Sequence, residues 1–254
     1  DHRDMPKDGN NAVKTYIDLH LIPKIKDPDE AGRLIKKAAE LGYRMASITL
    51  KKGSDEKEAK RVVEICREVG IDPIMRLDLT PKNTRELLND LRKFRRRYEI
   101  IAVISLKKSV ARQAAKDRRV DLLSFPPNPK SRFFDKAEAE LASRALASLE
   151  IDITPLLELN GMRRARLISC LRRETMIAKK FNIPIIISSG ATSPHLLRKP
   201  RDYAAIASIF DLDQNTAIKA VSDAPKLIIE RNRRKLSPNY VAPGVYIVRR
   251  GRDC

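Results

Sequence analysis

The residues best suited to metal-assisted chemistry are one histidine and three carboxylates that lie in or directly after apolar runs. They are Asp18, His20, Asp78 and Glu158. Imidazole and carboxylate groups are common ligands of divalent metals, and in a barrel of parallel strands such residues gather at the carboxyl ends of the strands. Arg76 and several lysines are expected at the same end. We therefore favour a barrel mouth held together by ion pairs over a metal site.

Histidine is too scarce for a centre with several metal ions. The chain holds His2, His20 and His195, and it has no H-E-x-x-H, no P-loop and no nucleophile elbow. The run from Asp18 to Ile22 resembles the opening of the polymerase-and-histidinol-phosphatase (PHP) phosphoesterases, metal-dependent barrels that begin with His-x-His. Ile22 stands at the second histidine position. We expect no catalytic residue and no metal ligand here, with Asp18 and His20 in structural roles.

The charge of the chain points to a polyanionic partner. Its 52 Lys and Arg outnumber 33 Asp and Glu, which leaves a formal net charge of +19. Such an excess favours nucleic acid or an anionic membrane surface. Trp is absent and aromatic residues make up 5%, so contacts with phosphates rather than stacking on bases would have to dominate.

Two classes of protein are excluded by the same composition. No apolar run reaches the 18 or so residues of a membrane span. The three cysteines, Cys66, Cys170 and Cys254, are far apart and odd in number, which fits neither a disulfide framework nor a zinc site. We expect a cytoplasmic protein that does not contact a membrane.

Seven apolar runs predict strands with helices between them. Most of the runs are near-continuous in Ile, Val and Leu, which is typical of parallel strands covered on both faces. Such a succession predicts a (β/α) barrel or a doubly wound sheet, and the lack of a glycine fingerprint after the first strand favours a TIM-barrel-like α/β fold on a PHP-like scaffold. The expected strands are Tyr16 to Ile22, Met45 to Leu50, Pro73 to Leu79, Ile100 to Leu106, Val120 to Phe125, Ile151 to Leu159 and Ile183 to Ser188.

The alternation of predicted strands and helices ends after the seventh strand. Pro200 to Asp211, Asn215 to Ser222 and Pro225 to Leu236 all predict helix, and no clear eighth strand follows. We expect a barrel of seven strands closed by these additional C-terminal helices. The predicted organisation is a polar tail over residues 1–14, one barrel domain over 15–236, and a basic tail over 237–254 with one strand-like run, Val245 to Val248.

Basic residues cluster after the strands and along the segment Met162 to Phe181. Leu167, Leu171, Ala178 and Phe181 share one face of that helix, and Arg166 and Arg173 flank it. A solvated face is the ordinary explanation for any single Lys or Arg, but acids are few among them. We predict a positive rim at the loop end of the barrel that binds RNA phosphates. The predicted RNA-binding residues are Lys51, Lys52, Arg76, Lys107, Lys108, Arg112, Lys130, Arg132, Arg163, Arg164, Arg166, Arg172, Arg173, Arg198, Lys199 and Arg201.

A succession of sequence blocks extends along most of the chain. The blocks are Tyr16 to His20, Val120 to Phe125, Phe134 to Ala139, Leu156 to Asn160, Ile185 to Ser193 and Leu197 to Ala204. The Ile-Ser-Ser-Gly-Ala stretch followed by a Pro-Arg-Asp helix start is the most specific part. Taken in this order, the blocks resemble ribonuclease P protein component 3, the 30-kDa subunit family of archaea and eukaryotes.

The resemblance implies a subunit of a ribonucleoprotein that removes 5′ leaders from precursor tRNA. It implies that the catalytic RNA performs the hydrolysis with Mg²⁺, that this chain binds no cofactor, and that it supports the active fold of the RNA. The implied partners are the ribonuclease P RNA, protein component 2 and other protein subunits, with precursor tRNA contacted indirectly. A free-standing PHP-type phosphoesterase remains the alternative, and Ile22 argues against it.

Overall fold

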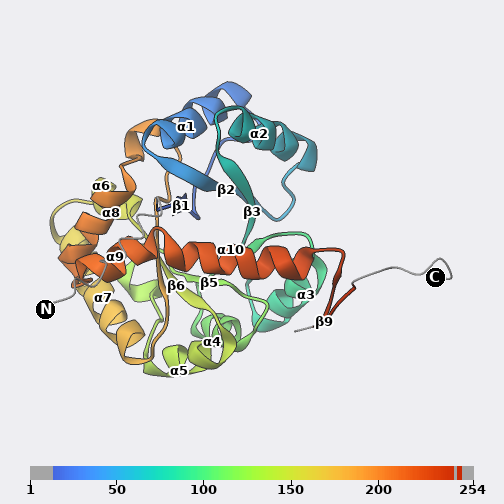
Figure 1. Cartoon of the computed structure of the whole chain (residues 1–254). Coiled ribbons are helices and arrows are strands. Elements are labelled where there is room, and N and C mark those ends of the chain that lie inside the picture. The colour runs from blue at the N-terminus through green and yellow to red at the C-terminus, as the bar shows by residue number, and fades with distance from the viewer. Residues whose placement is uncertain (1–13, 243–244, 248–254) are drawn as a thin grey trace, which may run out of the picture.

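The chain forms a barrel of seven parallel strands surrounded by helices (Figure 1). The computed structural model describes residues 14–242 and 245–247. The strands pair in the order in which they occur, from β1 to β7. They are β1 (Tyr16–Asp18), β2 (Tyr43–Lys51), β3 (Asp72–Leu79), β4 (Ile100–Ile104), β5 (Leu122–Ser124), β6 (Ser148–Asp152) and β7 (Ile185–Ser188).

Helices occupy the outside of the barrel and follow the strands in turn. Three short 3₁₀ turns, Pro129–Ser131, Pro194–Leu196 and Ala207–Phe210, lie between them. The helices are α1 (Pro28–Glu40), α2 (Glu56–Glu68), α3 (Thr84–Phe94), α4 (Lys108–Lys116), α5 (Lys136–Ala145), α6 (Thr154–Glu158), α7 (Gly161–Lys180), α8 (Pro200–Ile206), α9 (Gln214–Ala220) and α10 (Asp223–Leu236).

Side-chain caps fix where several helices begin. Asp27, Asn83, Asp135 and Asp213 each accept a hydrogen bond from a backbone N–H three residues later, which satisfies one of the free donors of a first helical turn. Asp55 caps α2 by accepting from the backbone N–H of Lys57, two residues later.

The predicted sixth strand is wrong in its position. Ile151 to Leu159 was expected, but β6 is Ser148–Asp152 and the chain then turns into α6. Pro155 lies in the first turn of α6, where the lack of an N–H costs nothing. The apolar residues after it therefore prolong the hydrophobic run without prolonging the strand.

The barrel is closed by few contacts between its first and last strands. β1 and β7 share no ladder, and an isolated parallel bridge joins Leu21 to Ala191 just beyond them. The backbone N–H of Ile22 donates to Ala191, and that of Ser189 donates to the carboxylate of Asp18. The prediction of seven strands with additional C-terminal helices is confirmed.

The core has two parts because side chains alternate across each strand. One part lies between the strands and the surrounding helices. The other fills the amino-terminal half of the barrel interior, with one or two residues from most strands. Its buried residues are Ile17, Leu19, Ile74, Ile100, Ala102, Leu122, Ile186, Ile228 and Ile229.

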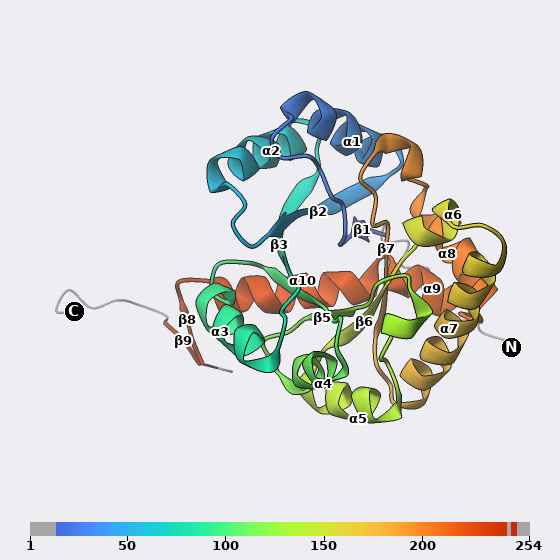
Figure 2. The ribbon, with the colours of Figure 1, turned by 180° about the vertical axis from the view of Figure 1, so that it is seen from behind.

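Helix α10 covers the amino-terminal end of the barrel (Figures 1 and 2). Ile228 and Ile229 pack against the interior cluster. On the same helix, Asn232 donates to the backbone oxygen of Glu99, just before β4, and Arg233 pairs with Asp72 at the start of β3. The helix thus seals the end of the barrel opposite the predicted rim.

After α10, two short strands, β8 (Tyr240–Ala242) and β9 (Val245–Tyr246), pair antiparallel. The second begins where the strand-like run Val245 to Val248 was predicted. Residues 1–13 of the predicted N-terminal tail and 248–254 of the basic tail lie outside the described residues.

The seal made by α10 predicts a cost for truncating its inner face. Ile229→Ala should lower the free energy of unfolding by about 2–5 kcal/mol, because the lost methyl groups leave a cavity in a closed core. Urea unfolding measures this. Leu227→Ala is the matched control, since Leu227 is 67% exposed on the same helix and should change stability by about 0.5 kcal/mol or less. An equal effect of the two substitutions would contradict the seal.

Candidate functional site

The carboxyl-terminal half of the barrel interior is polar. Along β3, the interior positions change from Ile74 to Arg76 and then Asp78, and β6 supplies Glu150 and Asp152. These side chains lie above the apolar layer, where the mouth of a barrel carries catalytic groups. The site is therefore where a barrel enzyme carries its catalytic groups. Whether these side chains could act in catalysis depends on the hydrogen bonds and ion pairs that they already form.

Arg76 is the centre of this polar layer and is completely buried. Its guanidinium donates to both oxygens of Glu150 at 2.6 and 2.8 Å, to Asp78 at 2.7 Å and to the backbone oxygen of Leu19 at 2.6 Å. The hydroxyl of Ser188 donates to Glu150 as well, at 2.8 Å. Four of the five guanidinium N–H groups are thus bonded inside the barrel.

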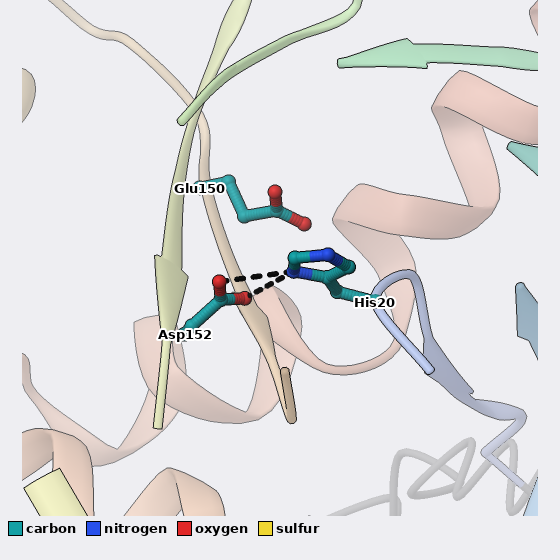
Figure 3. Close-up of side chains that lie close together, drawn as sticks. All are labelled: His20, Glu150 and Asp152. Atoms are coloured by element: carbon teal, nitrogen blue, oxygen red, sulfur yellow. Dashed lines mark hydrogen bonds and ion pairs between the residues drawn. The ribbon is translucent and has the colours of Figure 1, made fainter. Parts of the chain in front are cut away.

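His20 lies between two carboxylates, as Figure 3 shows for Asp152. Its Nδ1 is 2.8 Å from Asp152, and its Nε2 is 3.1 Å from Asp78. Burial alone would lower the pKa of His20, and Arg76 adds to that effect, but the two carboxylates outweigh both and raise the pKa to about 10. His20 is therefore a cation at neutral pH.

Asp18 joins the first strand to the last. Its carboxylate accepts hydrogen bonds from the backbone N–H groups of His20 and Ser189, at 3.1 and 2.9 Å. Burial raises the pKa of this carboxyl above its usual value, against the effect of those hydrogen bonds. Its contacts serve the closure of the barrel, and the predicted structural role of Asp18 fits them.

His20, Glu150 and Asp152 could together hold a metal ion (Figure 3). In residues 14–242 and 245–247 they are the one set of three His, Cys, Asp or Glu side chains whose ligand atoms lie within 4.8 Å of one another. The donor set does not fit a metal ion as it stands, because each group is already engaged. Both oxygens of Glu150 are bonded to Arg76, and both oxygens of Asp152 face the ring of His20. Two protein cations supply the positive charge, so no hydrolytic step follows from this geometry.

The sequence identified this site only in part. Glu158 was predicted at the end of the sixth strand, but it is the last residue of α6. Glu150 and Asp152 were missed. The signal for them was the alternation of charged and apolar residues in Ser148–Asp152, which is the period of a strand with one polar face.

Two predicted RNA-binding residues are wrong. Arg76 has no exposed surface, and Arg132 is 8% exposed and pairs with both oxygens of Glu174 at 2.6 and 2.8 Å. Glu174, the one acid in the α7 segment, is thus used by Arg132. Its charge is buried beneath α7 and does not pair with the arginines on the outer face of that helix.

The other predicted RNA-binding residues divide by what they bond within the described chain. Seven have neither an ion pair nor a hydrogen bond from the side chain, and they are Lys51, Lys107, Lys130, Arg163, Arg166, Arg173 and Lys199. Arg164, Arg198 and Arg201 donate only to uncharged oxygens. Ion pairs engage Lys52, Lys108, Arg112 and Arg172.

The structure brings three of the unpaired cations together. Lys130 follows β5, and Arg163 and Arg166 lie in the first two turns of α7. They line one groove of about 490 Å³, which we call the mouth groove, and Leu159 also lines it. No carboxylate lines it, so its positive charge is uncompensated.

Comparison with known proteins places the chain in a family. The model of the family described as RNase P subunit p30 matches residues 15–237. The chain belongs to the RNase P subunit p30 family. A relative named Ribonuclease P protein component 3, from Methanosarcina mazei, is 31% identical over 82% of this chain and 85% of its own. Another of the same name, from Methanococcoides burtonii, is 29% identical over 93% and 95%.

Solved structures agree with this p30-family assignment at the level of the fold. A chain in a cryo-EM structure of archaeal ribonuclease P with mature tRNA has a TM-score of 0.80 at 23% identity, covering 93% of this chain and all of that one. An organophosphorus hydrolase variant from Deinococcus radiodurans has a TM-score of 0.51 at 12% identity, covering 85% and 92%. The barrel is thus also the fold of an enzyme.

The network around His20 predicts a loss of stability at high pH. Folding raises the pKa of His20, so the protonated ring contributes to the free energy of unfolding. That contribution is fully present below about pH 6.5, the usual pKa of histidine, and it is lost as the pH rises through about 10. The urea midpoint of wild type should therefore fall relative to that of His20→Gln between pH 6.5 and 10. His195→Gln, at an exposed histidine, is the control and should track wild type. Parallel profiles for wild type and His20→Gln would show that His20 is not charged in the fold.

Proposed function

We propose that this chain is a protein subunit of ribonuclease P, the ribonucleoprotein that removes 5′ leaders from precursor tRNA, and that it binds and supports the RNA. The observation that carries the proposal is the family match over residues 15–237 together with relatives named Ribonuclease P protein component 3. The chain spans 85% and 95% of those two relatives' own length, so the proposal concerns nearly the whole protein.

The interior of the barrel supports a role without catalysis by this chain. Arg76 and His20 form ion pairs with the carboxylates that would otherwise be available for a metal or a proton transfer. Phosphodiester hydrolysis needs groups that can reach the substrate, whereas Glu150 and Arg76 have almost no accessible surface. We assign the chemistry, and the Mg²⁺ that it requires, to the RNA.

The mouth groove is the surface best suited to RNA. Three arginines, Arg163, Arg164 and Arg166, lie at the amino-terminal end of α7, where the helix dipole is itself positive. Asn160 precedes the helix without a side-chain cap. Cations at this end repel both the dipole and one another, so the groove gains stability when an anion enters. Guanidinium groups bind phosphate oxygens in pairs, and the chain offers few aromatic rings for stacking.

Protein component 2 and other ribonuclease P proteins are the partners we propose beside the RNA, with precursor tRNA contacted indirectly.

Each helix in the described residues is too short or too polar to cross a bilayer. We infer that the particle acts in the cytoplasm.

The groove predicts which charges govern assembly with the RNA. In Lys130→Ala/Arg163→Ala/Arg166→Ala, RNA binding should weaken and the slope of log K against log salt should become shallower by about 2–3, at 0.7–0.9 for each lost phosphate contact. Reconstitution of the particle across a salt series measures this. Lys60→Ala/Arg61→Ala/Arg67→Ala is the matched control, because it removes the same charge from exposed, unpaired positions on α2. Equal slopes for the two variants would remove the mouth groove from the RNA interface.

We also expect the isolated chain to bind no divalent metal with a defined stoichiometry, since its own cations occupy the carboxylate cluster. Titration with Mn²⁺ followed by calorimetry tests this. Binding of one ion per chain that disappears in Asp152→Asn would contradict the proposal and favour a metal-dependent phosphoesterase.

A further inference from the structure

A second basic hollow lies at the end of the barrel opposite the mouth groove. It has a volume of about 520 Å³ and is lined by the end of α3, the turn between α4 and β5, the end of α10 and the start of β8. The first two of these segments lead into strands, so they lie at the amino-terminal end of the barrel. We call this hollow the base pocket. Five cations line it with one carboxylate, and these are Arg95, Arg96, Arg118, Arg119, Lys235 and Asp121.

Two of the cations hold the pocket together. Arg95 donates to Asp121 at 2.5 Å and to the backbone oxygens of Tyr98 and Glu99. Arg119 forms a two-point ion pair with Asp117, at 2.9 and 2.7 Å. The single carboxylate of the lining, Asp121, is shared further with α10. The charges of Arg95 and Arg119 are therefore accounted for by the fold.

Arg96, Arg118 and Lys235 are different. All three are exposed, and none forms an ion pair or a hydrogen bond from its side chain within the described residues. Partial burial, followed by the nearby charges of Arg231, Arg95 and Arg118, lowers the pKa of Lys235 despite the attraction of Asp121. The pocket thus carries a positive potential that the protein itself does not neutralise.

We propose that the base pocket is a second RNA-binding site, which receives phosphate groups on Arg96, Arg118 and Lys235. The proposal rests on the proposed function for its ligand, and it adds a site that lies at the other end of the molecule. Phosphodiesters suit it better than an acidic protein surface. The three free cations come from three separate elements and surround a hollow, which matches a ligand that carries charge on several sides. The core of a protein–protein interface is depleted of charged residues, whereas five cations line this hollow.

Two phosphate sites at opposite ends of one barrel would let the protein bind two separate RNA segments at once. A single RNA helix cannot enter both, so the protein would join two segments of the RNA, or two RNA molecules, across its own width. Support of an RNA fold would then consist of holding those segments at the separation that the barrel sets.

The test counts binding sites on the full chain. A short RNA hairpin, too small to reach from one end of the barrel to the other, is titrated into the protein by calorimetry at low salt. We expect two hairpins per wild-type chain. Arg96→Ala/Arg118→Ala/Lys235→Ala and Lys130→Ala/Arg163→Ala/Arg166→Ala should each bind one, and the combination of all six should bind none. The three substitutions in the base pocket leave the Arg95–Asp121 and Arg119–Asp117 pairs intact, and a melting curve checks the fold.

The outcomes separate this site from the proposed function. If the base-pocket variant still binds two hairpins, or matches Lys60→Ala/Arg61→Ala/Arg67→Ala in salt slope, the second site is wrong while the mouth groove stands. If the mouth-groove variant and the base-pocket variant both bind RNA as well as wild type does, both proposed RNA sites are wrong. Capture of an acidic polypeptide, polyglutamate, in place of RNA would also overturn the proposal. If the base-pocket triple variant melts at a lower temperature than wild type, Arg118→Ala alone replaces it. The slope of log K against log salt should then become shallower by about 0.7–0.9.

Discussion

A buried guanidinium in the middle of the barrel is the constraint on which the rest of the structure depends. Arg76 joins β3 to β6 through Glu150, and it donates to the backbone oxygen of Leu19, the residue that follows β1. Taking these charges out of water costs several kcal/mol for each ion, and good geometry with further hydrogen bonds must offset that cost. Both are present, because Ser188 and Asp78 complete the bonding. Loss of one partner would leave an unpaired charge in a closed interior, which costs about 3–5 kcal/mol.

Ion pairing inside the barrel separates its interior from its surface. In the interior, Arg76 and His20 pair with the carboxylates of Asp78, Glu150 and Asp152, so the place where a barrel commonly carries out chemistry is filled with structural bonds. On the outside, many cations have no acid within reach. Such a molecule presents few unpaired catalytic groups to a small substrate and many cations to a polyanion, as the proposed role in RNA binding requires.

Prediction from sequence succeeded where the signal is local and failed where a distant partner decides. β3 and α7 follow near-continuous or periodic apolar residues, and both were found. The position of β6 was missed because Glu150 looks unsuited to a buried strand, and what makes it suitable is Arg76, 74 residues away. Arg76 was assigned to RNA for the same reason. Lys130 and Arg163 were expected at one rim because each follows a predicted strand, and Arg166 because it lies on a basic flank of the α7 segment. The cations of the base pocket precede strands and gave no such signal.

Helix α10 has a consequence for how the chain acquires its shape. The inner core joins Ile17, close to the start of β1, to Ile228 and Ile229, more than two hundred residues later. Contacts between such distant positions are slow to form, because a long loop must close before they stabilise anything. During synthesis, all seven strands leave the ribosome before the helix that seals them. Until it arrives, the apolar floor of the barrel faces water, and the nascent protein passes through an interval in which it is open at its base and prone to association with other chains.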